Sequence, residues 1–182
     1  SGGKSLALAS VMSNKGKIFA YDNNPHRLGR ANKRIARAGV KNIKIVTSTE
    51  SLTNSADRVL IDAPCSGSGT WRRDPALKWR TTLESISAKT VLQGNILETF
   101  SPFVALGGRL IYVTCSLFSD ENEQQVTSFL KSHPEFKPFP VGDVWKKLIG
   151  SSAPEVGPHM IQLTPFRTGT DGFFLASLER VS

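Results

Sequence analysis

The chain has 182 residues, of which 39% are hydrophobic, and a formal net charge of +8. This length suits one α/β domain with a substantial core, so we expect a single domain over residues 1–182. No apolar run approaches the roughly 20 residues that span a bilayer, and the first residues lack a signal-peptide pattern. The sequence argues against membrane and secreted proteins, and we expect a cytoplasmic protein with no membrane partner.

The positive charge is concentrated in the first half of the sequence. Residues 1–90 contain 16 Lys and Arg against 6 Asp and Glu, whereas residues 91–182 contain 7 against 9. Such an excess attracts polyanions and supplies phosphate contacts, but it carries no sequence specificity. A merely solvated surface would have the same composition.

Hydrophobic periodicity and turn residues predict alternating helices and strands. In chain order we expect a helix at Gly3–Ser13, a strand at Lys17–Tyr21, a helix at Pro25–Ala38, and strands at Asn42–Val46 and Arg58–Ile61. On the Pro25–Ala38 helix, Leu28, Ala31, Ile35 and Ala38 share one apolar face, and basic residues occupy the rest.

The second half continues the pattern and then changes character. We expect a helix at Ile86–Phe100, a strand at Arg109–Val113, a helix at Asp120–Leu130 with Ser119 as its N-cap, and strands at Met160–Leu163 and Gly172–Leu178. Prolines and glycines interrupt Pro134–Pro165, so little regular structure is expected there. Strands separated by long helices imply an α/β fold with a mainly parallel sheet, helices on both faces, and ligands beyond the carboxyl ends of the strands.

Polar motifs containing both cysteines of the chain follow two of the expected strands. Asp62-Ala63-Pro64-Cys65-Ser66-Gly67-Ser68-Gly69-Thr70 follows the third strand, and Thr114-Cys115-Ser116 follows the Arg109–Val113 strand. Two cysteines fifty positions apart fit neither a paired metal-ligand spacing nor a disulfide scaffold, and the three histidines show no ligand spacing, so we expect no metal. Two inert core cysteines are the alternative, but small polar neighbours at the carboxyl edge of a sheet are poor surroundings for a core residue.

Three ordered motifs resemble the Sun/Fmu-type (Nop/Sun) RNA cytosine-5 methyltransferase family: Asp62–Thr70 with the following Arg72-Arg73-Asp74-Pro75, Tyr112-Val113-Thr114-Cys115-Ser116, and Gly169-Thr170-Asp171-Gly172-Phe173-Phe174. The resemblance extends from Gly2 to Phe174. It implies a Rossmann-like methyltransferase fold that uses S-adenosyl-L-methionine (SAM), and an RNA substrate, either rRNA or tRNA. We expect the protein to act as a monomer.

The chemistry that the resemblance implies is covalent catalysis. Carbon-5 of cytosine is a poor nucleophile, so a thiolate must first add to carbon-6 and turn the ring into an enamine that attacks the methyl group of SAM. The family pattern makes Cys115 the nucleophile, Asp62 the residue that helps to protonate the ring nitrogen, and Cys65 the thiol that assists product release. Lys4 is a further candidate for contact with the target base. An exocyclic-amine methyltransferase would show an aromatic residue where Cys65 stands.

The cofactor-binding candidates come from the same resemblance. Gly2 and Gly3 match the end of the first SAM motif, where a glycine turn lets the cofactor approach the backbone. Asp22 suits the ribose hydroxyls, with a turn or N-cap role as the alternative, and the other candidates are Arg27, Ser48, Asp62 and Pro64. Gly3-Lys4-Ser5 also matches the end of a phosphate-binding loop of NTPases, but nothing later in the sequence supports that function.

Basic and aromatic residues follow the Asp62–Thr70 motif and form the RNA-binding candidates. Trp71, Arg72, Arg73 and Lys78, together with Trp79 and Arg80, could hold phosphates and stack on an extruded base. The alternative for the tryptophans is a role as core anchors.

Two departures from the family pattern lead to a second hypothesis. Thr47-Ser48-Thr49-Glu50 stands where family members place an aspartate for the adenine amine, and the chain begins inside the first SAM motif. We therefore expect the first strand of the sheet to be missing, together with any amino-terminal RNA-binding region. A catalytically impaired RNA-binding module of the same fold is the competing hypothesis. A methyltransferase for DNA or for another substrate is a third possibility, which the Thr114-Cys115-Ser116 motif and the basic half disfavour.

Overall fold

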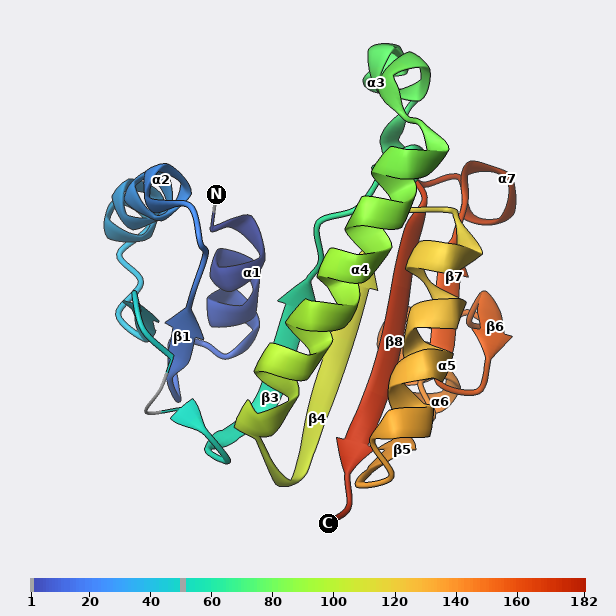
Figure 1. Ribbon diagram of the computed structural model, residues 1–182. Helices are drawn as coiled ribbons and strands as arrows, with labels where there is room; N and C mark the ends of the chain where they lie inside the picture. The colour runs from blue at the N-terminus through green and yellow to red at the C-terminus, as the bar shows by residue number, and fades with distance from the viewer. Residues whose placement is uncertain (1, 50–51) are drawn as a thin grey trace. The chain divides into compact units, whose positions relative to one another are not determined.

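The computed structural model describes residues 2–49 and 52–182, which belong to two compact units, Ser1–Leu52 and Thr53–Ser182 (Figure 1). The expectation of one catalytic domain over residues 1–182 stays a prediction. Within the described ranges, no helix combines the length and the apolar character needed to cross a membrane.

The first unit is a helix followed by a β-α-β motif. Its elements are α1 (Gly3–Val11), β1 (Ile18–Ala20), α2 (Pro25–Arg37) and β2 (Ile43–Ile45). Strands β1 and β2 pair in parallel, with Ile18 opposite Ile43 and Ala20 opposite Ile45. The sequence predicted all four elements in type and order, with ends that differ by one or two residues.

Helix α2 shows why its sequence begins and packs as it does. The Asn24 side chain caps the helix by accepting from the backbone N–H groups two and three residues later, at 3.0 and 3.3 Å. Ala31 and Ile35 are buried, which confirms the predicted apolar face at these positions. Ala38, predicted to share that face, is exposed at the C-cap, and the five basic residues of the helix are exposed.

The second unit contains the larger sheet. Its elements are β3 (Ala56–Asp62), η2 (Ser68–Thr70), α3 (Pro75–Arg80), α4 (Leu83–Phe100), η3 (Ser101–Phe103), β4 (Val104–Thr114), η4 (Ser119–Glu121), α5 (Glu123–Ser132), β5 (Phe136–Pro138), α6 (Gly142–Ile149), β6 (Glu155–Gly157), β7 (Met160–Leu163), α7 (Pro165–Thr168) and β8 (Phe173–Arg180). The strand order is β3-β4-β8-β7-β6, and β5 pairs with one end of β8.

The expectation of a mainly parallel sheet is wrong for this unit. Only β3 and β4 pair in parallel there, while β4–β8, β5–β8, β7–β8 and β6–β7 are antiparallel. A parallel pair needs a crossover of a dozen or more residues, and α4 supplies one between β3 and β4. The segment between β7 and β8 holds only the four-residue α7, so these strands run in opposite directions. The α/β class is confirmed, with a mixed sheet.

Helices α4 and α5 lie side by side on one face of this sheet (Figure 1). Their buried faces cover a core that includes Leu97 of α4, Val126 of α5, Leu110 and Tyr112 of β4, and Phe174 of β8. All five side chains are at most 1% exposed, and burying each large apolar side chain contributes about 1.5–3 kcal/mol. This packing fixes the end of β4, where the Cys115 motif begins.

Local signals account for the other differences from the predicted elements. Helix α4 begins three residues earlier than predicted, because Thr82 and Ser85 form a reciprocal capping box. Ser119 is not an N-cap but the first residue of η4, and α5 begins only at Glu123. The predicted loop Pro134–Pro165 contains α6. This helix ends at Gly150, which adopts a positive φ.

Candidate active site

The two cysteines lie together at the carboxyl ends of β3 and β4. The Sγ atoms of Cys65 and Cys115 are 3.3 Å apart, and both residues are free thiols of intermediate exposure. Strands β3 and β4 are neighbours with Asp62 opposite Val113, so the loops that follow them leave the sheet at the same edge. The prediction that both thiols lie at this edge is confirmed, and their intermediate exposure argues against the alternative of two inert core cysteines.

A buried carboxylate holds the loop that carries Cys65. Glu121 of η4 is 0% exposed, and its Oε1 and Oε2 accept from the backbone N–H and the hydroxyl of Ser66, at 2.8 and 2.5 Å. The Gln93 side-chain amide donates to Glu121 Oε1 at 3.1 Å and to the Pro64 carbonyl at 2.9 Å. The residues on both sides of Cys65 are therefore tied to α4 and η4.

The neighbouring residue, Asn122, holds the loop that carries Cys115. Its side-chain amide donates to the Ser116 carbonyl at 2.9 Å, and its Oδ1 accepts from the Thr114 hydroxyl at 2.6 Å. Gln162 of β7 accepts from the same Asn122 amide at 3.0 Å. Since Asn122 and Thr114 are fully buried, these bonds form in a low-dielectric interior where an unpaired group is costly.

Serine hydroxyls join the two loops to each other. Ser116 Oγ lies 3.3 Å from Ser66 Oγ and 3.1 Å from Ser68 Oγ, and the Leu117 N–H donates to Ser68 Oγ at 2.8 Å. All three serines are buried. The small polar residues of both motifs thus form one buried hydrogen-bonded cluster next to the two cysteines in the chain.

Two glycines let the third motif approach the first. The Gly69 N–H donates to the Cys115 carbonyl at 2.9 Å, and the Gly172 N–H donates to the Gly69 carbonyl at 2.8 Å. A Cβ atom on Gly69 would lie 2.3 Å from the carbonyl oxygen of Gly172, so no side chain fits there. The close approach brings Asp171 beside the Cys65 loop.

The surroundings of Cys65 favour its protonated form. The hydrogen bond with Cys115, followed by burial and by the charge of Cys115, raises the pKa of Cys65 well above the usual thiol value. Cys65 therefore stays protonated and can donate its S–H to the sulfur of Cys115. This arrangement suits one attacking sulfur beside one proton-bearing sulfur.

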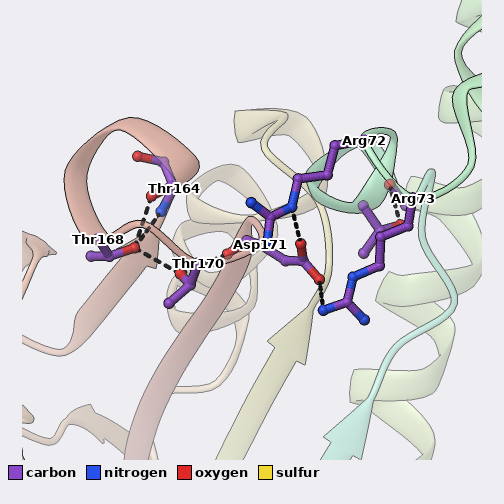
Figure 2. A network of polar contacts seen from close by, with 8 residues as sticks. Arg72, Arg73, Thr164, Thr168, Thr170 and Asp171 are labelled. Carbon is purple, nitrogen blue, oxygen red and sulfur yellow. Dashed lines mark hydrogen bonds and ion pairs between the residues drawn. The ribbon is translucent and has the colours of Figure 1, made fainter.

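The RNA-binding candidates in this unit occupy different surroundings. Arg72 Nε and Arg73 Nη2 each contact one carboxylate oxygen of Asp171, at 2.6 and 2.7 Å (Figure 2). Trp71 packs edge-on against Phe118, with ring centroids 5.9 Å apart, which favours the anchoring alternative for this tryptophan. Lys78 is exposed, and its Nζ lies 5.8 Å from the ring of the exposed Trp79.

The other candidates are placed as follows. Asp62 and Pro64 are exposed residues on either side of the buried Ala63, where β3 ends.

In the first unit, Gly2, Gly3 and Lys4 form the start of α1, and Ser48 is exposed beyond β2. Asp22 Oδ1 accepts from the Asn24 N–H at 2.9 Å and Oδ2 lies 3.9 Å from Arg27 Nη1, so Asp22 does take part in the turn before α2. Glu50 lies outside the described residues.

The start of α1 has the features of a helix start that can bind an anion. Gly2 has φ +76, and a Cβ atom there would meet the Ala31 Cβ at 3.0 Å, so only glycine suits this turn. No side chain caps the helix, and its first turn contains no acidic residue. Backbone N–H groups at such a helix start can donate hydrogen bonds to a carboxylate.

Sequence reasoning missed the residues that hold the cysteine loops. Glu121 and Asn122 were expected in the first turn of the Asp120–Leu130 helix with no role in the site, but both are fully buried. Gln93 and Gln162 received no role. One signal was present: Gln93 lies four residues before Leu97, on the buried face of α4, where a polar side chain needs a partner.

Solved structures with a similar fold define the class of protein. The crystal structure of PH0851 is 39% identical with a TM-score of 0.88, covering 98% of this chain and 40% of that one. NSun6 from Pyrococcus horikoshii with SFG, a SAM analogue, is 29% identical with a TM-score of 0.77, covering 100% and 46%. The chain therefore has the Rossmann-like fold of SAM-dependent methyltransferases.

The family follows from the sequence comparison. Residues 1–179 match the family described as 16S rRNA methyltransferase RsmB/F, and the chain belongs to that family, which confirms the Sun/Fmu resemblance. A probable ribosomal RNA small subunit methyltransferase B from Bacillus subtilis is 34% identical over 98% of this chain and 41% of its own length. The tRNA (cytosine(72)-C(5))-methyltransferase of Pyrococcus horikoshii is 33% identical over 99% and 45%. The chain spans about two fifths of the length of such relatives.

Proposed function

We propose that this chain is the catalytic part of an RNA cytosine-5 methyltransferase in which Cys115 attacks the base and Cys65 assists release. The observation that carries the proposal is the 3.3 Å separation of the sulfurs of two partly exposed cysteines at the carboxyl edge of β3 and β4. A relative named as a tRNA (cytosine(72)-C(5))-methyltransferase supports carbon-5 of cytosine as the target.

Cys115, Asp62 and Cys65 have different roles in the proposed reaction. The Cys115 thiolate adds to carbon-6 of the cytosine, while Asp62 supports protonation of the ring nitrogen. SAM, when bound, supplies an electrophilic methyl group to carbon-5. Solvent water takes the carbon-5 proton, the carbon-5–carbon-6 double bond re-forms, and the carbon-6–sulfur bond breaks. The Cys115 sulfur then leaves as a thiolate, which the Cys65 S–H stabilises by its hydrogen bond. Gly2, Gly3, Asp22, Arg27, Ser48 and Pro64 are the proposed cofactor contacts, and Lys4 a proposed contact to the base.

The assignment of the two roles follows the family pattern, in which the cysteine of Thr114-Cys115-Ser116 attacks, and the raised pKa of Cys65 agrees with it. A sulfur that holds its proton is a poor nucleophile, and the raised pKa of Cys65 describes such a sulfur. A neighbouring sulfur that receives the Cys65 S–H as a hydrogen bond is stabilised as a thiolate. The nucleophile is therefore assigned to Cys115.

Transfer of a labelled methyl group tests this function. The chain is incubated with methyl-labelled SAM and with 16S rRNA or tRNA transcripts, and the digested nucleosides are identified by mass spectrometry. We expect 5-methylcytidine with the parent chain and none with Cys115→Ala. A methyl group on any other atom, or full turnover by Cys115→Ala, would overturn the mechanism.

The competing function is an RNA-binding module of the same fold, motivated by Ser48 at the usual aspartate position. Titration with SAM separates the two functions. Binding of SAM supports the enzyme, whereas RNA binding without SAM binding supports the module.

A further inference from the structure

The connection between β7 and β8 lies at the same edge as the cysteines. Thr114, the last residue of β4, pairs with Phe174 at the start of β8, and Gly172 donates to Gly69 next to the Cys65 loop. Residues 164–171 therefore stand beside the proposed catalytic loops. Figure 2 shows the turn of α7 next to Asp171 and its two arginines.

A cavity of about 600 Å³ opens between this connection and α6. Trp145, Ile149 and Leu163 provide apolar surface, Arg167, Thr168 and Thr170 provide polar groups, and the remaining lining residues are Ser151, Ser152, Ala153 and Pro154. The lining combines an aromatic side chain, a guanidinium and hydroxyls, with no carboxylate. Such a composition suits a base together with its phosphate.

The α7 turn is held in a fixed shape. Thr164 Oγ1 accepts from the Arg167 N–H at 3.0 Å, and Thr168 Oγ1 donates to the Thr164 carbonyl at 2.8 Å and lies 2.7 Å from Thr170 Oγ1 (Figure 2). The turn presents Phe166, which is 99% exposed, immediately before Arg167. Burial of the exposed Phe166 ring against a partner would be favourable, because it removes a large apolar surface from water.

Charge favours a polyanionic partner on this surface. Arg167, Lys146 and Lys147 are exposed, and none of them forms an ion pair with a carboxylate among residues 2–49 and 52–182. Asp171 neutralises only one of the charges of Arg72 and Arg73. By contrast, another cavity of this unit, of about 380 Å³, is lined by Asp143 and Glu155 and no basic residue, and would repel phosphate.

We propose that the cavity between α6 and α7 holds an unstacked nucleotide of the same RNA, next to the target cytosine. Arg167 contacts its phosphate, Trp145 faces its base, and Phe166 stacks on the adjoining base. This inference rests on the proposed function for the identity of the RNA. It adds an RNA contact to those proposed for Arg72 and Arg73.

Binding of a labelled RNA over a salt series tests the proposal without SAM. The probe is a single-stranded oligonucleotide of about ten residues with one central cytosine, a length within the usual range for such sites. Arg167→Gln should weaken binding and reduce the slope of log Kd against log salt by about 0.7, because the variant neutralises one phosphate fewer. Phe166→Ala should weaken binding about 5-fold or more with an unchanged slope, because it removes only stacking.

A charge-matched control is Lys131→Gln. Lys131 lies in the last turn of α5, at the end of the helix away from the cysteine loops. This substitution should leave both Kd and the slope unchanged. Parent-like binding by both Arg167→Gln and Phe166→Ala would overturn the proposal and assign the surface to a protein or small-molecule partner. If RNA binding depends on Arg167 but the chain transfers no methyl group, the proposed methyltransferase function is overturned and the proposed nucleotide site stands. A parent chain that fails to bind RNA would overturn both.

Discussion

The Glu121 carboxylate accepts two hydrogen bonds from Ser66, one from its backbone N–H and one from its hydroxyl, across 55 positions of the sequence. Its neighbour Asn122 binds the Ser116 carbonyl. Two consecutive buried residues thus hold the residue after each cysteine. The separation of the two sulfurs is fixed by this pair as much as by the sheet.

We expect Glu121→Gln to lower the free energy of unfolding by about 1–3 kcal/mol, because one of the two acceptor oxygens becomes a donor facing Ser66. Urea denaturation followed by circular dichroism measures the change. Asp120→Asn is the matched control: it also removes one carboxylate charge, but Asp120 is exposed, so its effect should stay within about 0.5 kcal/mol. Equal effects of the two substitutions would show that the buried carboxylate does not hold the loop.

Gly69→Ala is expected to destabilise the chain by about 1–3 kcal/mol or more, because the added Cβ overlaps the Gly172 carbonyl and forces the two loops apart. Gly94→Ala supplies the comparison. Gly94 lies inside α4, and a Cβ atom there would meet only Gln125 Oε1, at 3.7 Å. Gly94→Ala should therefore raise the free energy of unfolding by about 0.5–1 kcal/mol. Urea midpoints give both values, and a neutral Gly69→Ala would contradict the close approach.

The raised pKa of Cys65 predicts an order of alkylation. Because the thiolate is the reactive form and Cys65 keeps its proton, iodoacetamide at mildly alkaline pH should modify Cys115 before Cys65. Mass spectrometry of the two cysteine peptides over time measures the order. In urea, where the hydrogen bond between the sulfurs is broken, both should react at similar rates. Faster modification of Cys65 in the native chain would reverse the proposed roles.

The sequence predicted the meeting of Cys65 and Cys115 correctly, because both follow strands and parallel neighbours end at one edge. It could not predict the antiparallel β8, since the pairing of a strand depends on which partner lies within reach after its loop. Gly107 and Gly108 also look like a break between elements, yet they lie inside β4, where Gly107 adopts φ +73.

Burial explains the missed site residues. Glu121 and Asn122 have the composition of an exposed helix start, and only the tertiary contacts with Ser66, Gln93 and Thr114 reverse that expectation. Helix α6 was missed for a related reason. Its flanking prolines and glycines predict loops, while the helix itself is short and contains no buried residue.

The covalent role of Cys115 is tested most directly by trapping the protein on RNA. Cys65→Ala and Cys115→Ala are each incubated with SAM and a methyl-accepting transcript, and the products are separated on a denaturing gel. Our account predicts a stable protein–RNA adduct with Cys65→Ala, because addition proceeds while release is impaired, and no adduct with Cys115→Ala. An adduct that persists in Cys115→Ala, or that depends on Cys65, would contradict it.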